Sequence, residues 1–155
     1  MNILFICTGN VSRSFLAEML LKQSMAGQQV SPAQVQSAGL FTNPGAGPDP
    51  VMVRYLEDRH IVFDRHASQA VTPDLLDWAD LVLVMEKFHL DLLVNIRPDS
   101  KRKIQLLGRY LSGNQQEDEI RDPFGKSAFH YRLAQSQIAL AVQTLTASLL
   151  KGKVS

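Results

Sequence analysis

A cysteine and an arginine are separated by five residues in the segment Cys7–Ser14, which reads CTGNVSRS. The segment follows a short apolar run and precedes a helical pattern, so its backbone N–H groups can converge on a tetrahedral anion. Gly9 lets such a loop turn tightly, and Asn10 tolerates a left-handed backbone. Arg13 adds a planar guanidinium that can hold two oxygens of a phosphate group.

The thiol of Cys7 is placed for nucleophilic chemistry. Converging N–H dipoles, the helix end and Arg13 all favour the thiolate, which can attack phosphorus and form a phosphocysteine intermediate. The leaving oxygen then needs a proton and the attacking water needs a base, and one carboxylic acid can do both in turn. Asp122, in the segment RDPFG at residues 121–125, is the expected acid. It precedes the last predicted helix, and Phe124 beside it is expected to line the pocket.

Alternating apolar runs and helical patterns predict the elements that position these residues. Runs rich in Ile, Leu and Val predict buried strands at 2–7, 35–38, 81–85 and 103–107. Periodicity and capping patterns predict helices at 14–28, 49–59, 86–96 and 128–150, and another that begins at Thr72-Pro73. This order predicts an α/β fold, a three-layer α/β/α arrangement around a four-stranded parallel sheet, as a single domain over residues 1–155. Ligands of such sheets sit at the carboxyl ends of strands, so the loop after the first strand is the expected phosphate-binding loop.

Composition and charge exclude several functions. The 155 residues include 16 Lys plus Arg and 15 Asp plus Glu, a net charge of +1, so a broad nucleic-acid surface is not expected. The single cysteine excludes an internal disulfide, a CxxC redox pair and a multi-cysteine zinc site, and it fits a reducing compartment. No apolar stretch is long enough to span a membrane, and the N-terminal run is too short for a signal peptide. A cytoplasmic location is therefore expected.

The four histidines, His60, His66, His89 and His130, show no metal-binding spacing, and no metal or other cofactor is expected. Of these, His60, His89 and His130 are interpreted as surface residues or as core residues with satisfied hydrogen bonds. The loop lacks both the Lys-Ser/Thr pair of a nucleotide P-loop and a G-x-G-x-x-G pattern, which disfavours binding of nucleoside triphosphates and dinucleotides.

Five motifs in order resemble the low-molecular-weight protein tyrosine phosphatase family, as a bacterial member, over nearly the whole chain. They are Cys7–Ser14 after the first strand, Ala17-Glu18, Ser37-Ala38-Gly39, residues 80–86 (DLVLVME) and Asp122-Pro123-Phe124. The resemblance implies a metal-independent enzyme that hydrolyses phosphotyrosine in proteins through phosphocysteine. A phosphorylated protein is the partner that this family implies, with a bacterial tyrosine kinase as one candidate, and the sequence carries no signal for an oligomeric state.

The resemblance also implies a role for each site residue. Cys7 is the expected nucleophile, Arg13 binds phosphate and stabilises the transition state, and Asp122 is the acid and then the base. The rest of the phosphate-binding loop is Thr8, Gly9, Asn10, Val11, Ser12 and Ser14. Ser14 is expected to hydrogen-bond the thiolate. The network that supports the loop is expected to include Ser14, Asn10, Ser37 and His66. The pocket wall is expected to include Phe41 and Phe124.

Three positions depart from the family pattern. Ser12 stands where many members have a second cysteine that can protect the nucleophile as a disulfide. Phe15 replaces the usual proline after Arg-Ser, which is expected to cost order in the first helical turn and not chemistry. Phe124-Gly125 replaces the paired aromatic residues of many tyrosine-specific members.

The segments Ser37–Phe41 and 122–125 also resemble bacterial protein-arginine phosphatases, which tend to carry Thr where this chain has Val11. The apolar, β-branched Val11 offers no polar contact to a guanidinium, so phosphotyrosine is favoured over phosphoarginine. An arsenate reductase that uses an internal disulfide is excluded by the single cysteine, although one served by an external thiol stays a minor alternative. A phosphopeptide-binding module without catalysis is another alternative, but a binder needs neither the thiol nor Asp122.

Overall fold

The computed structural model describes residues 1–28, 34–111 and 118–154. Within these residues, four strands form one parallel sheet in the order β2-β1-β3-β4. The strands are β1 (Asn2–Cys7), β2 (Gln34–Gly39), β3 (Leu81–Val84) and β4 (Ile104–Leu106). The α-helices are α1 (Arg13–Met25), α2 (Pro50–Asp58), α3 (Pro73–Trp78), α4 (Lys87–Ile96) and α5 (Ala128–Leu150), and two 3₁₀ helices are η1 (Pro98–Lys103) and η2 (Leu107–Tyr110). The predicted α/β fold with a four-stranded parallel sheet is confirmed.

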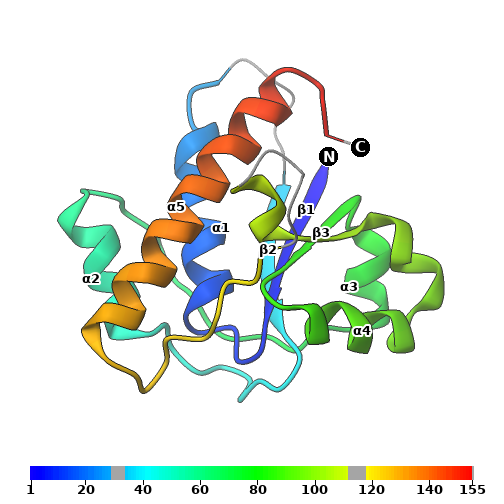
Figure 1. The fold of residues 1–155 in the computed structure, drawn as a ribbon, viewed down its shortest axis with the longest axis horizontal. Coiled ribbons are helices and arrows are strands. Elements are labelled where there is room, and N and C mark those ends of the chain that lie inside the picture. The colour runs from blue at the N-terminus through cyan, green and yellow to red at the C-terminus, as the bar shows by residue number, and fades with distance from the viewer. Residues whose placement is uncertain (29–33, 112–117, 155) are drawn as a thin grey trace.

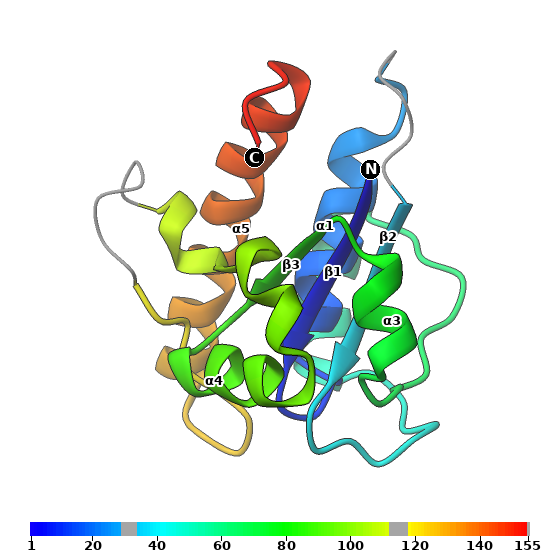
Figure 2. The same ribbon diagram turned by 90° about the vertical axis from the view of Figure 1, so that its right-hand side faces the viewer.

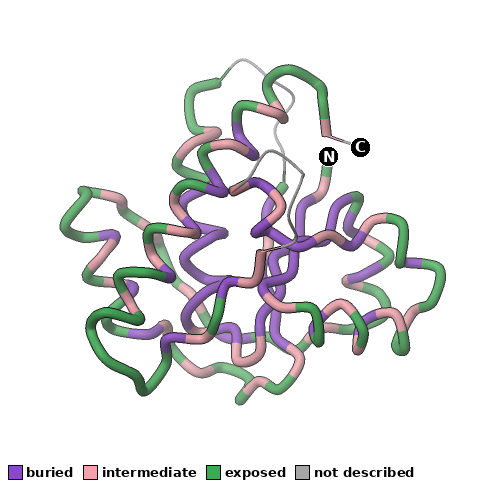
Figure 3. The backbone as a smooth tube through the Cα atoms, in the orientation of Figure 1, coloured by how far each residue is buried: buried purple, intermediate pink, exposed green. Residues whose placement is uncertain are grey.

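Alternation along the buried strands creates the three layers. Odd-numbered β1 residues such as Ile3 and Phe5 pack with α1 and α5, while Leu4 and Ile6 pack with α3 and α4. Figures 1 and 2 show α1 and α5 on one face of the sheet and α3 and α4 on the other. The buried backbone runs through the centre of the molecule in Figure 3. The sheet is therefore covered on both faces, as its continuous apolar strands require.

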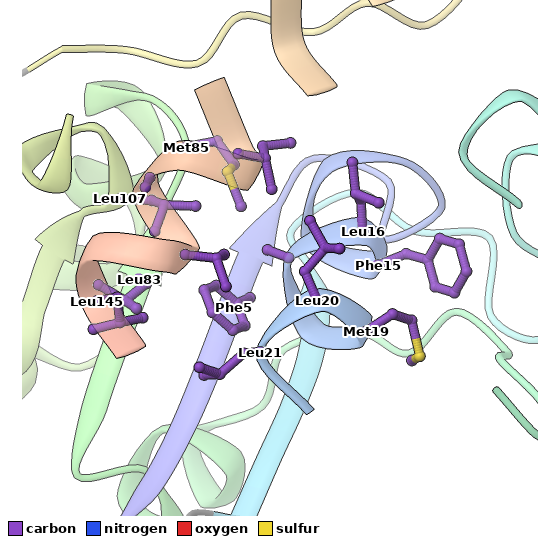
Figure 4. Packing of buried hydrophobic residues seen from close by; sticks show 14 of the residues in the cluster. Phe5, Phe15, Leu16, Met19, Leu20, Leu21, Leu83, Met85, Leu107 and Leu145 are labelled. Atoms are coloured by element: carbon purple, nitrogen blue, oxygen red, sulfur yellow. The ribbon is translucent and has the colours of Figure 1, made fainter. Parts of the chain in front are cut away.

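The larger of the two apolar layers holds α1 and α5 against the sheet. Figure 4 shows Phe5 and Leu83 of the sheet among Leu20 and Leu21 of α1 and Leu145 of α5. All five of these side chains are at least nine-tenths buried. This packing fixes the angle at which α1 leaves β1, and so fixes the loop that joins the two elements.

Local signals explain most of the helix boundaries. The Thr72 hydroxyl accepts from Leu75 N at 3.1 Å and Asp49 Oδ1 accepts from Val51 N at 3.0 Å, so both side chains cap helices that begin where the sequence predicts. Helix α1 ends at Met25 and not at residue 28, because Ala26 is extended and Gly27 has a φ of 78°. The predicted strand 103–107 shortens to Ile104–Leu106, since its flanks belong to the 3₁₀ helices. Among the described residues, no helix is both long and apolar enough to cross a membrane.

Candidate active site

The loop between β1 and α1 lies at the carboxyl end of the sheet, and its carbonyl groups are turned outward. Leu40 N donates to Cys7 O, Phe41 N to Thr8 O and Asp49 N to Val11 O, at 3.1, 2.9 and 2.8 Å. Within the described parts of the chain, no backbone N–H of residues 8–14 donates to a protein acceptor. These donors are therefore available to an anion at the start of α1.

Two backbone features give the loop its tight curl. Asn10 adopts a φ of 56°, the left-handed conformation that asparagine tolerates best after glycine. Gly39 at the end of β2 packs directly under the loop, and a Cβ there would lie 2.7 Å from Thr8 O and 2.5 Å from Thr42 Cγ2. The small residue in the Ser37-Ala38-Gly39 motif thus lets the loop approach the sheet.

Cys7 lies at the end of β1 with 2% of its surface exposed, and its Sγ is 3.0 Å from Ser14 Oγ. Asn10 Nδ2 donates to that same Ser14 oxygen at 2.9 Å. Because the oxygen already accepts this bond, the Ser14 hydroxyl proton is free to point at the sulfur. The arrangement suits a thiolate that accepts a hydrogen bond, and it brings together three of the residues that the sequence singles out.

A polar network under the loop holds Asn10 in place. Its Nδ2 also donates to Ser37 Oγ at 2.9 Å, and Ser37 Oγ donates to Glu18 of α1. The Asn10 carbonyl accepts from His66 Nε2 at 2.7 Å and from Ser68 Oγ at 3.2 Å. The structure therefore brings Ser37 and His66 to Asn10, where the family resemblance implies they belong.

Arg13 is the largest of the fully buried side chains, with only 1% of its surface exposed. Its Nη1 donates to the carbonyl of Ile120 at 2.7 Å and to the carboxylate of Glu86. Its Nη2 lies 3.6 Å from Asp122 Oδ2. Since a buried cation is costly unless it is paired and hydrogen-bonded, these partners hold the guanidinium in one place beside the loop.

Asp122 is the exposed end of this cluster. Its carboxylate keeps 44% of its side-chain surface open, and Oδ1 accepts from Phe124 N at 3.1 Å in a tight turn. Figure 1 shows the segment before α5 passing the lower end of β1, where the loop lies. Phe124 is 60% exposed and Phe41, whose N–H is bonded to the loop, is 65% exposed. Both rings are thus at the surface, free to contact a ligand.

Comparison with known proteins shows the family of this chain. The model of a family described as low molecular weight phosphotyrosine protein phosphatase matches residues 2–155. The chain belongs to this family. It is 33% identical over 153 residues to a protein-arginine-phosphatase of Bacillus subtilis (strain 168), covering 99% of both chains. It is 35% identical over 127 residues to the low molecular weight protein-tyrosine-phosphatase Wzb of Escherichia coli (strain K12), covering 81% of this chain and 80% of Wzb.

A solved structure of the same family has nearly the same fold. It is the structure of a YwlE arginine phosphatase mutant with a phosphorylated active site serine, and it aligns with a TM-score of 0.87 at 31% identity. The alignment covers 96% of this chain and 95% of that one. The architecture of this phosphatase family member is therefore that of enzymes named for either tyrosine or arginine dephosphorylation.

The structure adds residues that sequence reasoning did not assign to the site. His89, interpreted as surface or satisfied core, is fully buried and touches the phosphate loop. Its Nδ1 accepts from Glu86 N at 3.1 Å and its Nε2 is 2.9 Å from Thr8 Oγ1. Nε2 therefore carries the proton and donates to Thr8, which leaves the Thr8 hydroxyl free to donate elsewhere. The only sign of this contact in the sequence is that His89 follows Glu86, the last residue of the motif at 80–86, by three positions.

The environment of His89 predicts a pH dependence of stability. Burial, and then the charge of Arg13, lower the pKa of His89 from its ordinary 6.5 to about 3. Between these values the unfolded chain binds a proton that the folded chain does not, so stability falls as pH drops below about 6.5. We expect urea unfolding to show a larger loss between pH 7.5 and 5 for the wild type than for His89→Gln.

The control for this measurement is His130→Gln, because His130 is exposed on α5, where it hydrogen-bonds Ser127 and packs edge-on against Phe129. The control should keep the wild-type slope of stability against pH. An identical slope for the wild type and His89→Gln would contradict the assignment of a neutral His89.

Phe15, one of the departures from the family pattern, has a local explanation in the structure. Phe15 is fully buried, and its ring centroid lies 5.2 Å from Phe63 and 4.7 Å from His66. Helix α1 begins at Arg13 without the usual proline, and Phe15 supports the histidine that holds Asn10. Ser12 is 3% exposed, and among the described buried side-chain N and O atoms its Oγ is the one without a hydrogen-bond partner.

The Ser12 position predicts how the protein responds to oxidation. Cys7 is the only cysteine, so a sulfenic acid formed there by peroxide has no second thiol in the chain to trap it. Prolonged peroxide then carries the sulfur to the sulfinic acid, which thiols do not reduce. We expect less activity to return with dithiothreitol than in Ser12→Cys, which supplies a neighbouring thiol. Full recovery of the wild type after prolonged excess peroxide would contradict this prediction.

Proposed function

We propose that this phosphatase family member hydrolyses phosphotyrosine in proteins through a phosphocysteine intermediate. The observation that carries the proposal is the loop of free N–H groups that surrounds one end of β1, with Cys7 at its base and the buried Arg13 at its side. Such a site suits a tetrahedral dianion, whose charge the loop N–H groups and the guanidinium would stabilise. The family model supports the same reading.

In the first step, the Cys7 thiolate attacks phosphorus from the side opposite the leaving oxygen. An S–P bond forms while the P–O bond to the tyrosine breaks, and Asp122 gives its proton to the departing phenolate. The loop N–H groups and Arg13 bind the equatorial oxygens, on which charge is spread in the transition state. The 3.6 Å distance from the Asp122 carboxylate to Arg13, and its exposure to solvent, support this role.

In the second step, water attacks the phosphorus of the phosphocysteine, and Asp122 takes a proton from that water. The S–P bond breaks, inorganic phosphate leaves and the thiolate of Cys7 returns. The Ser14 hydroxyl, 3.0 Å from the sulfur, donates to the departing thiolate and eases its release. The YwlE arginine phosphatase mutant, in which an active site serine is phosphorylated, supports a covalent intermediate in this reaction.

Phosphoarginine is the second candidate substrate, because the chain is similar to protein-arginine-phosphatases. The protein-arginine-phosphatase of Bacillus subtilis matches 99% of this chain, a wider match than that to Wzb. Val11 disfavours phosphoarginine, because this half-buried apolar side chain offers no hydrogen bond to a guanidinium. The exposed ring of Phe124 instead suits stacking on a phenyl group.

The test is hydrolysis of two peptides of identical sequence, one with phosphotyrosine and one with phosphoarginine, in the presence of EDTA. We expect a higher kcat/KM for phosphotyrosine and a shift toward phosphoarginine in Val11→Thr. A wild-type preference for phosphoarginine would keep the mechanism and replace the substrate. Hydrolysis of neither peptide, with inorganic phosphate still bound, would favour a binding module.

We infer a single phosphatase domain over residues 1–155, a cytoplasmic location that keeps Cys7 reduced, and no requirement for a metal ion. A bacterial tyrosine kinase is the class of enzyme that must supply phosphotyrosine, and its own phosphorylated form is a candidate substrate. Retained activity in EDTA and loss after thiol oxidation test the chemical part of this inference.

A further inference from the structure

A groove of about 760 Å³ runs between α2 and the first turns of α5. The two helices lie next to each other at the lower left of Figure 1. The cationic side chains that line it are Arg54, Arg59, Lys126 and Arg132. One carboxylate, Asp58, is among the lining residues. The groove is therefore strongly positive on a chain whose net charge is only +1.

These four cations are available to a ligand. All four are exposed, and within the described residues none forms an ion pair with a carboxylate. Arg59 is held in place by Tyr55, with its guanidinium 3.4 Å from the ring centroid and a 3.1 Å hydrogen bond to the Tyr55 carbonyl. Cations left without acidic partners in one groove mark a surface for anions.

Two hydrogen bonds link one wall of the groove to the catalytic loop. Tyr131, which lines the groove, donates through its hydroxyl to Asp49 Oδ2 at 2.7 Å, and Asp49 N donates to Val11 O of the loop at 2.8 Å. At the other wall, Lys126 N donates at 2.9 Å to the carbonyl of Pro123, the residue that follows Asp122. Both walls of the groove are thus bonded to segments that carry site residues, Val11 of the loop and Pro123 beside Asp122.

We propose that the α2–α5 groove binds carboxylate side chains that flank the phosphorylated residue of the substrate. The inference rests on the proposed phosphatase function and names its substrate class, an acidic phosphoprotein segment. Arginine pairs with carboxylates bidentately, and a positive groove also speeds the encounter with an acidic chain. Each pair is exposed to solvent, so the contribution of each is modest and falls with added salt.

The experiment compares two phosphotyrosine peptides, one flanked by Asp and Glu and one by Asn and Gln at the same positions. We expect the wild type to prefer the acidic peptide about five- to tenfold in kcat/KM at low salt, through KM and not kcat. Arg54→Gln combined with Arg132→Gln should lose this preference. The ratio of acidic-peptide to small aryl phosphate hydrolysis should fall with it.

Lys101→Gln combined with Arg102→Gln is the charge-matched control, because both residues are exposed on η1 and neither lines the groove. The control should keep the wild-type preference. Equal loss in both double variants would overturn the proposal in favour of a general effect of net charge. A wild type that hydrolyses a small aryl phosphate but ignores flanking charge would overturn it as well.

A binding measurement separates this inference from the proposed function. Fluorescence anisotropy of the labelled acidic peptide needs no turnover, so it reports on the groove even if no ester is hydrolysed. We expect binding that weakens in the Arg54 and Arg132 double variant and with salt. Unchanged binding in that variant would overturn the proposal, as would binding to vesicles of anionic lipid in preference to the peptide.

Discussion

Cys7→Ser is expected to lower turnover of a phosphotyrosine peptide by roughly 10⁴-fold or more. A serine hydroxyl is not ionised near neutral pH, and its neighbour, the Ser14 hydroxyl, is a donor to the sulfur and not a base. The exchange removes no N–H group of the loop and leaves Arg13 with its partners. Binding of inorganic phosphate, measured by calorimetry, should therefore be largely retained.

The control for this variant is its fold, which circular dichroism and thermal unfolding should show to be close to the wild type. Cys7 is buried, and serine is similar in size, so a large change in stability is not expected. Turnover within tenfold of the wild type would contradict the assignment of Cys7 as nucleophile. Loss of both turnover and phosphate binding would show instead that the loop had changed its shape.

Asp122→Ala is expected to slow hydrolysis of a phosphotyrosine peptide by about 10²- to 10⁴-fold. The phenolate leaving group of tyrosine is basic, so it depends on a proton from Asp122. An aryl phosphate with an acidic phenol leaves without that help, and its rate should fall much less. A series of aryl phosphates should therefore show a steeper dependence of rate on the leaving group in the variant than in the wild type.

The matched control is Asp99→Ala, which removes an exposed carboxylate on η1. It should leave both rates and the leaving-group dependence unchanged. Because Asp122 lies 3.6 Å from Arg13, its removal also takes a negative charge away from the phosphate site, and inorganic phosphate should bind no more weakly. A wild-type rate with a basic leaving group would contradict the role assigned to Asp122.

The fold follows from local patterns that are easy to read. The strand at Asn2–Cys7 and the helix at Ala128–Leu150 occupy the predicted residues, because each is a long, uniform apolar pattern with clear ends. The 3₁₀ helices around β4 were not predicted. They arise where Pro98 ends α4 and where η2 packs against α5, a tertiary contact that leaves no periodic signal.

The candidate site was predictable where its residues are close in sequence. Cys7, Asn10, Arg13 and Ser14 belong to one loop, and the loop geometry follows from their types. The bond between Thr8 and His89 spans 81 residues, and no spacing rule in a single sequence indicates it. Glu86 is another case, since its partner Arg13 is 73 residues away and a buried cation is visible only once the chain is folded.

The bond from Arg13 to the Ile120 carbonyl joins residues 107 positions apart. The loop itself lies between the first strand and the first helix, but the guanidinium is seated only after the segment that leads into α5 has docked. Contacts between distant residues form late, because chain closure costs entropy before any contact repays it. We therefore expect phosphate affinity to appear with the last step of refolding, and a nascent chain to gain a working site only once its C-terminal helix has been released from the ribosome.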